Sequence, residues 1–262
     1  MYHKGKNNAN HCGIILIGSD IMNYIEKLQK LIDDSDNIVF FGGAGVSTES
    51  GIKDFRGRNG LYKMKQNPNS KISPEYMLSS KFLFKEPLTF FNYYRKNMSC
   101  LNANPNVTHN YLKKLEDKGK LKAIVTQNID GLHQKAGSKN VFEIHGTMSN
   151  CYCMNCMKEY LGDYIFNAEG IPKCECGGIV RPNIVLYGEM LPEAYSKASY
   201  YISQADLLIV GGTSLTVEPA SGLLKLFRGR HLIIINDTET HYDDMAELVI
   251  HNSLGEVFSK LK

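Results

Sequence analysis

The chain has 262 residues, of which 43% are hydrophobic and 22% charged, and its 30 basic and 27 acidic side chains leave a formal net charge of +3. This length and apolar content suit one large globular domain, or a domain with a smaller lobe. The nearly balanced charge gives no electrostatic reason to expect nucleic acid or a membrane as partner, and no apolar run is long enough to cross a bilayer.

The first 21 residues differ from the remainder. They are polar and rich in Asn and Lys, and their one apolar run, Gly13 to Gly18, is too short for a secretory core. We expect residues 1–21 to form a flexible extension, a candidate for sequence upstream of the natural start. An amphipathic helix is predicted from Met22, because Ile25, Leu28 and Leu31 recur at helical spacing.

A glycine-rich loop follows the first predicted strand. The apolar run Ile38 to Phe41 is typical of a buried strand in a parallel sheet, and it leads directly into Gly42-Gly43-Ala44-Gly45. Such glycines let backbone approach a ligand, and a helix beginning beside them would favour phosphate. A tight turn between strand and helix explains the glycines equally well. The ordinary dinucleotide fingerprint fails, because Thr48 occupies the position of its third glycine and no acid follows about twenty residues later.

The next segment sets an acid, an aromatic ring and an arginine between two glycines, in Gly51-Ile52-Lys53-Asp54-Phe55-Arg56-Gly57. We expect a flexible loop that folds over a ligand. Together with Gly43-Ala44-Gly45-Val46-Ser47, this segment resembles the sirtuins, the NAD-dependent protein-lysine deacylases. Their signature is Gly-Ala-Gly-x-Ser followed by Gly-Ile-Pro-Asp-Phe-Arg. Gly42 here replaces the usual threonine, which should leave backbone contacts to phosphate intact. Lys53 replaces the usual proline, a change expected to loosen the loop. The resemblance implies NAD contacts from Gly43, Ala44, Gly45, Thr48, Asp54, Phe55 and Arg56.

Polar side chains end the second predicted strand. Gln127, Asn128 and Asp130 come directly after the apolar run that ends at Val125 and Thr126. Because ligands of an open parallel sheet bind at the carboxyl ends of its strands, these side chains are site candidates on position alone, although an Asx turn is the alternative. Gln-Asn-Ile-Asp is also a sirtuin motif. The resemblance implies that Ile129 and Asp130 hold the nicotinamide carboxamide and that Asn128 lies by the ribose and an ordered water.

A histidine ends the third predicted strand, in Val141-Phe142-Glu143-Ile144-His145-Gly146. Such a residue taken alone is more often structural, but it matches the sirtuin Ile-His-Gly motif at the expected distance from the Asn-Ile-Asp loop. The chemistry needs a base with a pKa near neutrality to take a proton from a ribose hydroxyl, which suits imidazole. His145 is therefore the expected base. His109 and His133 lack this pattern, and we expect them to be structural.

Two further strand ends complete the expected nucleotide site. Gly212, Thr213 and Ser214 follow the buried strand Leu207 to Val210, and the resemblance implies that they face phosphates and ribose. Asn236 ends the last strand, where it would bind the adenine ribose, and the segment ending at Leu254 would close the adenine pocket. In sirtuins two extended segments clasp the substrate peptide as an added strand, which implies broad substrate choice. Here they contain Val185, Tyr187, Gly188, Glu189, Leu215 and Val217.

Two cysteine pairs predict a structural zinc site. Cys153 and Cys156 are separated from Cys174 and Cys176 by a short ribbon, a spacing typical of a tetrahedral thiolate site without an open position. Cys151 adds a nearby thiol, as substitute ligand or bystander. Disulfides are the alternative, but paired cysteines of this kind favour metal in a reducing compartment, so we expect the cytoplasm.

Residues 59–105 carry aromatic side chains at helical spacing and predict a helical insertion over the nucleotide site. Most of these aromatics are expected to be core. In the family this segment helps to wall the acyl-lysine tunnel, and the subgroup that removes acidic acyl groups has a Tyr-x-x-Arg pair here. Asn92 stands three residues before Arg95, so the tyrosine is missing. This favours acetyl or other uncharged acyl groups.

The predicted fold is an α/β, Rossmann-like, doubly wound parallel sheet with a smaller lobe made of a helical insertion and a zinc ribbon. The catalytic domain spans 22–262, with the large NAD-binding lobe in 22–58, 106–147 and 180–262 and the small lobe in 59–105 and 148–179. The expected activity is NAD-dependent removal of acetyl from lysine in proteins or peptides, giving nicotinamide, O-acyl-ADP-ribose and free lysine. The alternatives are a protein mono-ADP-ribosyltransferase and a non-enzymatic, zinc-stapled NAD sensor. No oligomer is implied.

Overall fold

The computed structural model describes residues 19–54, 57, 60, 72–100 and 102–262. Its strands are β1 (Ile38–Gly42), β2 (Leu121–Thr126), β3 (Val141–Glu143), β4 (Gly146–Cys153), β5 (Glu159–Leu161), β6 (Val180–Ile184), β7 (Leu207–Gly211), β8 (His231–Ile235) and β9 (Leu248–Ile250). Its α-helices are α1 (Ser19–Asp33), α2 (Pro74–Met77), α3 (Ser80–Lys85), α4 (Pro87–Met98), α5 (Val107–Asp117), α6 (Leu132–Lys135), α7 (Asp163–Asn167), α8 (Glu193–Gln204) and α9 (Leu254–Phe258). The 3-10 helices are η1 (Ala44–Ser50), η2 (Ser221–Leu226) and η3 (Asp243–Met245).

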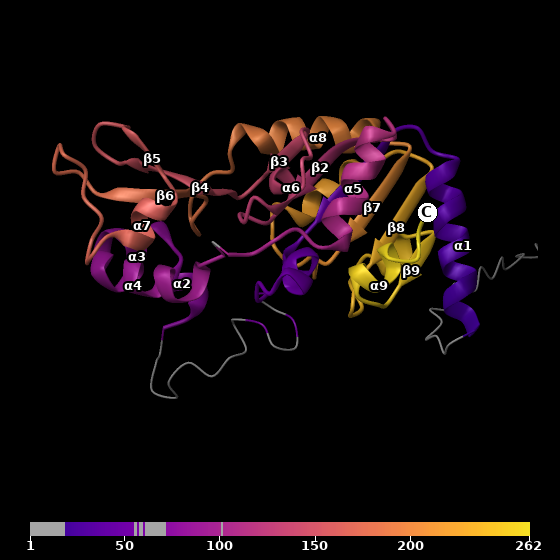
Figure 1. Ribbon diagram of the computed structural model, residues 1–262, viewed down its shortest axis with the longest axis horizontal. Helices are drawn as coiled ribbons and strands as arrows, with labels where there is room; N and C mark the ends of the chain where they lie inside the picture. Colours follow the sequence, from indigo (N-terminus) through magenta and orange to yellow (C-terminus); the bar gives the residue numbers. More distant parts are fainter. Residues whose placement is uncertain (1–18, 55–56, 58–59, 61–71, 101) are drawn as a thin grey trace, which may run out of the picture.

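A six-stranded sheet in the order β3-β2-β1-β7-β8-β9 forms the larger lobe (Figure 1), and all of its pairings are parallel. Every residue of β1 and of β7 is buried, as expected when helices cover both faces of a sheet. Helices α1, α5 and α9 pack on one face, and α8 and η2 pack on the other. The predicted doubly wound α/β fold is therefore confirmed.

The smaller lobe combines the three-stranded antiparallel sheet β5-β4-β6 with the short helices α2, α3, α4 and α7. In Figure 1 it lies to the left of the parallel sheet. Strand β6 pairs with β4 in this lobe, although the sequence division placed residues from 180 onward in the large lobe. An apolar run identifies a strand but does not say which sheet takes it.

The aromatic side chains of the insertion mostly form the core of the small lobe. Phe82, Phe90, Phe91 and Tyr94 are buried there, as the sequence predicts, whereas Phe84 is 69% exposed. Helix α1 begins at Ser19, three residues before the predicted start at Met22. Of the part of the chain that the structure describes, no helix is long and apolar enough to span a membrane.

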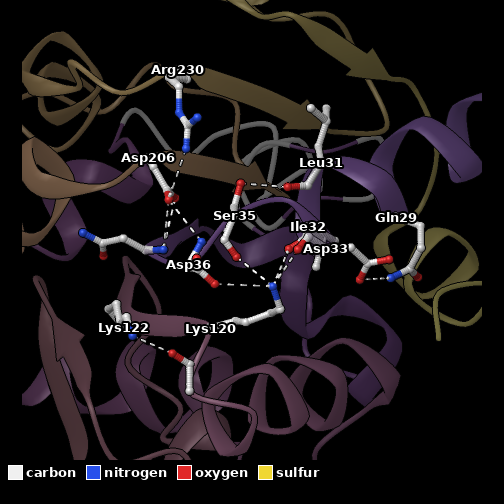
Figure 2. A network of polar contacts seen from close by, with 12 residues as sticks. Gln29, Leu31, Ile32, Asp33, Ser35, Asp36, Lys120, Lys122, Asp206 and Arg230 are labelled. Carbon is white, nitrogen blue, oxygen red and sulfur yellow. Dashed lines mark hydrogen bonds and ion pairs between the residues drawn. The ribbon is translucent and has the colours of Figure 1, made fainter.

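A lysine directly before β2 ties the end of α1 to the amino end of that strand (Figure 2). Lys120 Nζ donates to the carbonyl oxygens of Ile32 at 3.4 Å, Asp33 at 2.8 Å and Ser35 at 2.9 Å, and lies 3.8 Å from the Asp36 carboxylate. A cation at the C-terminal end of a helix satisfies its last carbonyls and interacts favourably with its dipole. Lys120 therefore fixes the end of α1 beside β2.

We expect Lys120→Met to lower the free energy of unfolding by about 2 kcal/mol, because several charge-assisted hydrogen bonds are lost together. The apolar stem is kept, so the change isolates the ammonium group. Urea denaturation measures the effect, and kcat/KM should stay unchanged because the residue lies at the opposite end of the strands. Lys122→Met is the matched control, since within the described part of the chain Lys122 Nζ donates to the local Gly119 carbonyl alone. Equal losses in both variants would contradict this role.

Candidate active site

A cavity of about 1340 Å³ opens at the carboxyl ends of β1, β2, β7 and β8, with walls from both lobes. It brings together most of the residues that the sequence singled out from distant segments. On the nucleotide side these are Gly43, Ala44, Gly45, Thr48, Asp54, Gln127, Asn128, Ile129, Asp130, His145, Gly212, Thr213, Ser214, Asn236 and Leu254. On the expected peptide side they are Val185, Tyr187, Gly188, Glu189 and Val217.

Three predicted residues stand apart. Phe55 and Arg56 lie outside the described residues. Leu215 does not line the cavity: its side chain is 4% exposed in the core between the sheet and α8, and its φ is 54°. Its expected contact with substrate is therefore limited to backbone.

The glycines after β1 are required by a neighbouring loop rather than by a ligand alone. A Cβ on Gly43 would lie 2.7 Å from Thr213 Cβ, and one on Gly45 would lie 2.7 Å from Gly212 Cα. The Gly45 N–H donates to the Gly212 carbonyl at 2.8 Å, and the Gly43 N–H donates to Gly211 at 3.1 Å. A 3-10 helix, η1, follows. The expected phosphate cradle thus has fewer free N–H groups than the sequence suggested, and the glycines seat two strand-end loops against each other.

Ser47, Asn128 and Asp130 form a polar triangle at the base of the cavity. Ser47 Oγ donates to Asp130 Oδ2 at 2.7 Å and accepts from Asn128 Nδ2 at 3.0 Å. The other Asp130 oxygen accepts the Leu132 N–H at 2.9 Å. Ser47 is 1% exposed, and although it stands in the Gly-Ala-Gly-x-Ser motif, sequence reasoning gave it no role. It joins the β1 and β2 loops and fixes the Asp130 carboxylate.

His145 is held in one tautomer by the backbone. Its Nδ1 lies 3.0 Å from the Gln127 carbonyl oxygen. Because a carbonyl can only accept, Nδ1 carries the proton and Nε2 keeps its lone pair. Burial lowers the pKa of His145 below its usual value, partly offset by the bond to Gln127, so the ring is neutral near pH 7. Gly146 follows at φ 76°, where a Cβ would lie 2.3 Å from the Asn183 carbonyl oxygen. The arrangement suits a general base.

The β7 loop and the β8 end supply hydrogen-bonding groups further along the cavity. Thr213 Oγ1 accepts from Gln127 Nε2 at 3.0 Å and from the Leu215 N–H at 3.2 Å. Asn236 is 8% exposed, and its side-chain amide donates to the Thr238 carbonyl at 2.7 Å. These contacts fix the orientation of both side chains in the wall of the cavity.

The expected peptide segment is fixed by a buried ion pair. Glu189 accepts from Arg181 Nη1 at 2.5 Å and Nη2 at 3.0 Å, and from the Leu186 N–H at 2.8 Å. Arg181 is only 6% exposed. Burial works to raise the pKa of Glu189, but the hydrogen bonds from Arg181 and Leu186 outweigh it and hold that pKa below its usual range. The Glu189 carboxylate thus shapes the segment 185–189 instead of facing a substrate.

We expect Glu189→Gln to lower the free energy of unfolding by about 3 kcal/mol, since it leaves a buried guanidinium without its counter-charge. The same loss should appear in the native protein as pH falls through the lowered pKa of Glu189, because a depressed carboxyl pKa stabilises the fold only while the group is ionised. The KM for an acyl-peptide should rise. Thermal denaturation and steady-state kinetics measure both. The exposed Glu193–Lys197 pair is the control, and Glu193→Gln should change neither quantity. Equal effects in both variants would contradict the argument.

The four predicted cysteines meet in one cluster. The Sγ atoms of Cys153, Cys156, Cys174 and Cys176 all lie within 4.8 Å of one another, with Cys153 to Cys176 at 3.5 Å and Cys156 to Cys174 at 3.6 Å. Tetrahedral zinc with Zn–S bonds of about 2.3 Å requires S–S separations of about 3.8 Å, far longer than a disulfide bond. The donor set therefore fits structural zinc with no open position.

Cys151 is a bystander to this cluster. Its Sγ lies 3.2 Å from the Leu161 carbonyl oxygen, and the residue is 1% exposed. The cluster has outer contacts of its own, since the Tyr160 hydroxyl donates to Cys174 Sγ at 3.0 Å and the Asn155 N–H donates to Cys153 Sγ at 3.4 Å. Such contacts stabilise thiolate ligands. The sequence did not show whether Cys151 is a metal ligand. In the structure its thiol contacts the Leu161 carbonyl instead of joining the four-cysteine cluster.

The cavity at the carboxyl ends of the parallel sheet, with His145 in its wall and a four-cysteine ribbon in the small lobe, fits a zinc-stapled α/β enzyme that acts with a dinucleotide. The model of the Sir2 family matches residues 43–219. The NAD-dependent protein deacetylases of Clostridium acetobutylicum and Clostridium perfringens are 53% and 52% identical over 240 residues, covering 90% of this chain and 97% and 98% of theirs.

Solved Sir2 structures agree with this. A Sir2 structure with a deacetylated p53 peptide and 3'-O-acetyl-ADP-ribose has a TM-score of 0.83 and 38% sequence identity to this chain. A second, with a p53 peptide and NAD, has a TM-score of 0.79 and 37% identity. Each comparison covers 90% of this chain and 96% of the solved chain. The chain belongs to the Sir2 family of NAD-dependent protein deacetylases. The predicted family, NAD co-substrate and zinc cluster are thereby confirmed.

Proposed function

We propose that this protein removes acetyl and other uncharged acyl groups from lysine side chains, with His145 as general base. The observation that carries the proposal is the fixed tautomer of His145, whose Nε2 keeps its lone pair in the cavity that also holds the Ser47, Asn128 and Asp130 triangle. A pure NAD sensor has no need of a base held in this way.

Different residues around the cavity would bind different parts of NAD and the acyl-lysine peptide. Asp130 and the Ile129 backbone would hold the nicotinamide carboxamide, with Asn128 beside the ribose. The loops at Gly43 to Gly45 and Gly212 to Ser214 would bind the phosphates and ribose, with Asn236 and Leu254 at the adenine end. The acyl-lysine peptide would pair with the segments at 185–189 and 214–217. Such main-chain pairing accepts many sequences, so the partners are acyl-lysine proteins as a class.

We propose the following reaction at these positions. The acyl oxygen attacks the anomeric carbon as nicotinamide leaves. His145 Nε2 then takes the proton of a ribose hydroxyl, which attacks the acyl carbon, and water releases free lysine and O-acyl-ADP-ribose. Zinc takes no part in these steps, since four thiolates leave it no open position. A reduced thiolate cluster suits a reducing compartment, so we place the enzyme in the cytoplasm.

The small lobe supports the preference for uncharged acyl groups. Arg95 turns away from the cavity: its Nε donates to the Ile165 carbonyl at 2.8 Å and its Nη2 to Gly170 at 2.5 Å. Phe91 and Tyr94, on the same helix, are buried in the core. The Arg95 guanidinium is therefore bound to carbonyls in and just after α7, and it is not placed to pair with an acidic acyl group.

Mass spectrometry of an acetyl-lysine peptide incubated with and without NAD tests the proposal. Free lysine, nicotinamide and acetyl-ADP-ribose should appear together, and only with NAD. A succinyl-lysine peptide of the same sequence should react at least tenfold more slowly. ADP-ribose attached to protein with the acetyl group intact would select the transferase, and unchanged NAD with tight binding would select the sensor.

A further inference from the structure

Two buried histidines that take no part in the proposed chemistry lie behind the candidate nicotinamide site. His109 on α5 is fully buried and His133 on α6 is 1% exposed, and their ring centroids are 4.7 Å apart. Among the described residues, His109 Nε2 and both ring nitrogens of His133 have no hydrogen-bond partner. Burial lowers the pKa of His109 to about 4 and that of His133 to about 3, so both are neutral at pH 7.

Stability alone does not explain this pair. Each unpartnered buried polar atom costs about 1–3 kcal/mol, which an apolar side chain of similar size would avoid. An apolar ring is one of the neighbours, since Phe40 and His133 pack edge to face at a centroid distance of 6.3 Å. Polar groups that weaken a core are found where function requires them.

The first connection runs from His109 to the η1 segment. His109 Nδ1 accepts the backbone N–H of Asn106 at 3.2 Å, as part of the capping box that starts α5. The Asn106 side chain in turn donates to the Val46 carbonyl at 2.7 Å and to Ser50 Oγ at 3.0 Å. His109 Nδ1 also lies 2.9 Å from Asn106 Oδ1, so His109 contacts a side chain that joins the start of α5 to η1.

The second connection runs from His133 to the Asp130 turn. His133 lies in the short helix α6, whose first residue, Leu132, donates its N–H to Asp130 Oδ1. The other Asp130 oxygen accepts from Ser47, which lies in η1. Asp130 is also close enough for its charge to raise the pKa of His109 against the effect of burial. The two connections thus meet at η1 and enclose the Asp130 carboxylate.

We propose that His109, through Asn106, and His133, through its place in α6, are positioning residues that hold η1 and the Asp130 turn in register, so that the nicotinamide end of NAD meets a preformed site. This inference rests on the proposed function. Neither histidine touches the ligand, because neither lines the cavity. Replacing either histidine should therefore weaken the binding of NAD and nicotinamide, and leave peptide binding by the segments at 185–189 and 214–217 unchanged.

Steady-state kinetics of zinc-loaded His109→Leu test this. Loss of the capping acceptor should raise the KM for NAD about tenfold and weaken nicotinamide inhibition by a similar factor, as expected when a hydrogen bond that positions a site is lost. The KM for an acetyl-peptide should change less than twofold. His109→Asn, which can place an oxygen near the position of Nδ1, should restore most of the NAD affinity. His133→Leu should act in the same direction as His109→Leu.

Leu115→Ala is the matched control, because Leu115 lies on the same helix, is 1% exposed, and leaves a cavity when truncated. It should lower Tm without changing either constant. Unchanged NAD and nicotinamide constants in His109→Leu would overturn the proposal. If His109→Leu fails to fold, Asn106→Ala is measured in its place. Unchanged NAD and nicotinamide constants in Asn106→Ala would also overturn the proposal. If the native protein binds NAD but does not deacetylate, the proposed function fails, and the same tenfold change in the NAD Kd by calorimetry still decides the inference.

Discussion

Deacetylation should fall at least a thousandfold when His145 is replaced by alanine, because the ribose hydroxyl loses its base and general-base catalysis supplies about 10²–10⁴ in rate. The Gln127 carbonyl, which now accepts from Nδ1, remains able to take a water. We therefore expect the fold, the zinc content and NAD binding to persist. Single-turnover deacetylation, zinc analysis and calorimetric NAD titration measure the three quantities separately.

The pH profile of kcat/KM for the native enzyme should also fall on the acidic side because His145 becomes protonated. Burial lowers its pKa below the ordinary value of 6.5, so Nε2 is free at pH 7 and is protonated only under more acidic conditions. The kcat/KM should thus be flat near neutrality and decline only as the pH falls through the lowered pKa of His145. His231→Gln is the control, since His231 bonds to Glu247 on the surface and should leave the profile unchanged. Normal turnover by His145→Ala would sink the assignment of the base.

Removal of one zinc ligand should be equally severe by a different route. Cys174→Ser is expected to release the metal and unfold the small lobe, because β4, β5 and β6 are short strands and structural zinc contributes on the order of 10 kcal/mol to such ribbons. Activity should disappear with the lobe, since its residues form part of the cavity wall. Zinc content per chain and circular dichroism measure the loss.

Cys151→Ala gives the matched control. Its thiol faces the Leu161 carbonyl and lies outside the cluster, so the variant should keep one zinc ion per chain and most of its activity. Zinc loss from Cys151→Ala, or a full zinc content in Cys174→Ser, would contradict the assigned ligand set.

Local patterns predicted most of the fold correctly. The strands β1, β2, β7 and β8 are almost continuously apolar because both faces of the sheet are covered, and such runs are visible in sequence. Polar residues at their carboxyl ends marked the cavity for the same reason, since parallel strands end at one edge. The two cysteine pairs were readable because zinc fixes ligand spacing along the chain.

Contacts between distant segments could not be predicted from the sequence. Gly45 is needed because Gly212 lies against it, and Leu215 turns into the core because its backbone is left-handed. The sequence places Glu189 in the segment expected to pair with the peptide, but it does not show that Arg181 binds the Glu189 carboxylate. Periodicity and spacing report which face of an element is buried, but not which partner covers it.

The sequence by itself determined the family, the parallel α/β sheet and the four clustered cysteines, and it singled out His145 as the proposed base, because each depends on residue type at short spacing. Only the tertiary structure decided how these parts are held: Ser47 against Asp130, Asn106 against η1, and Lys120 against the end of α1. The physical reason is that hydrogen bonds of this kind act over about 3 Å in space while their partners are far apart in the chain.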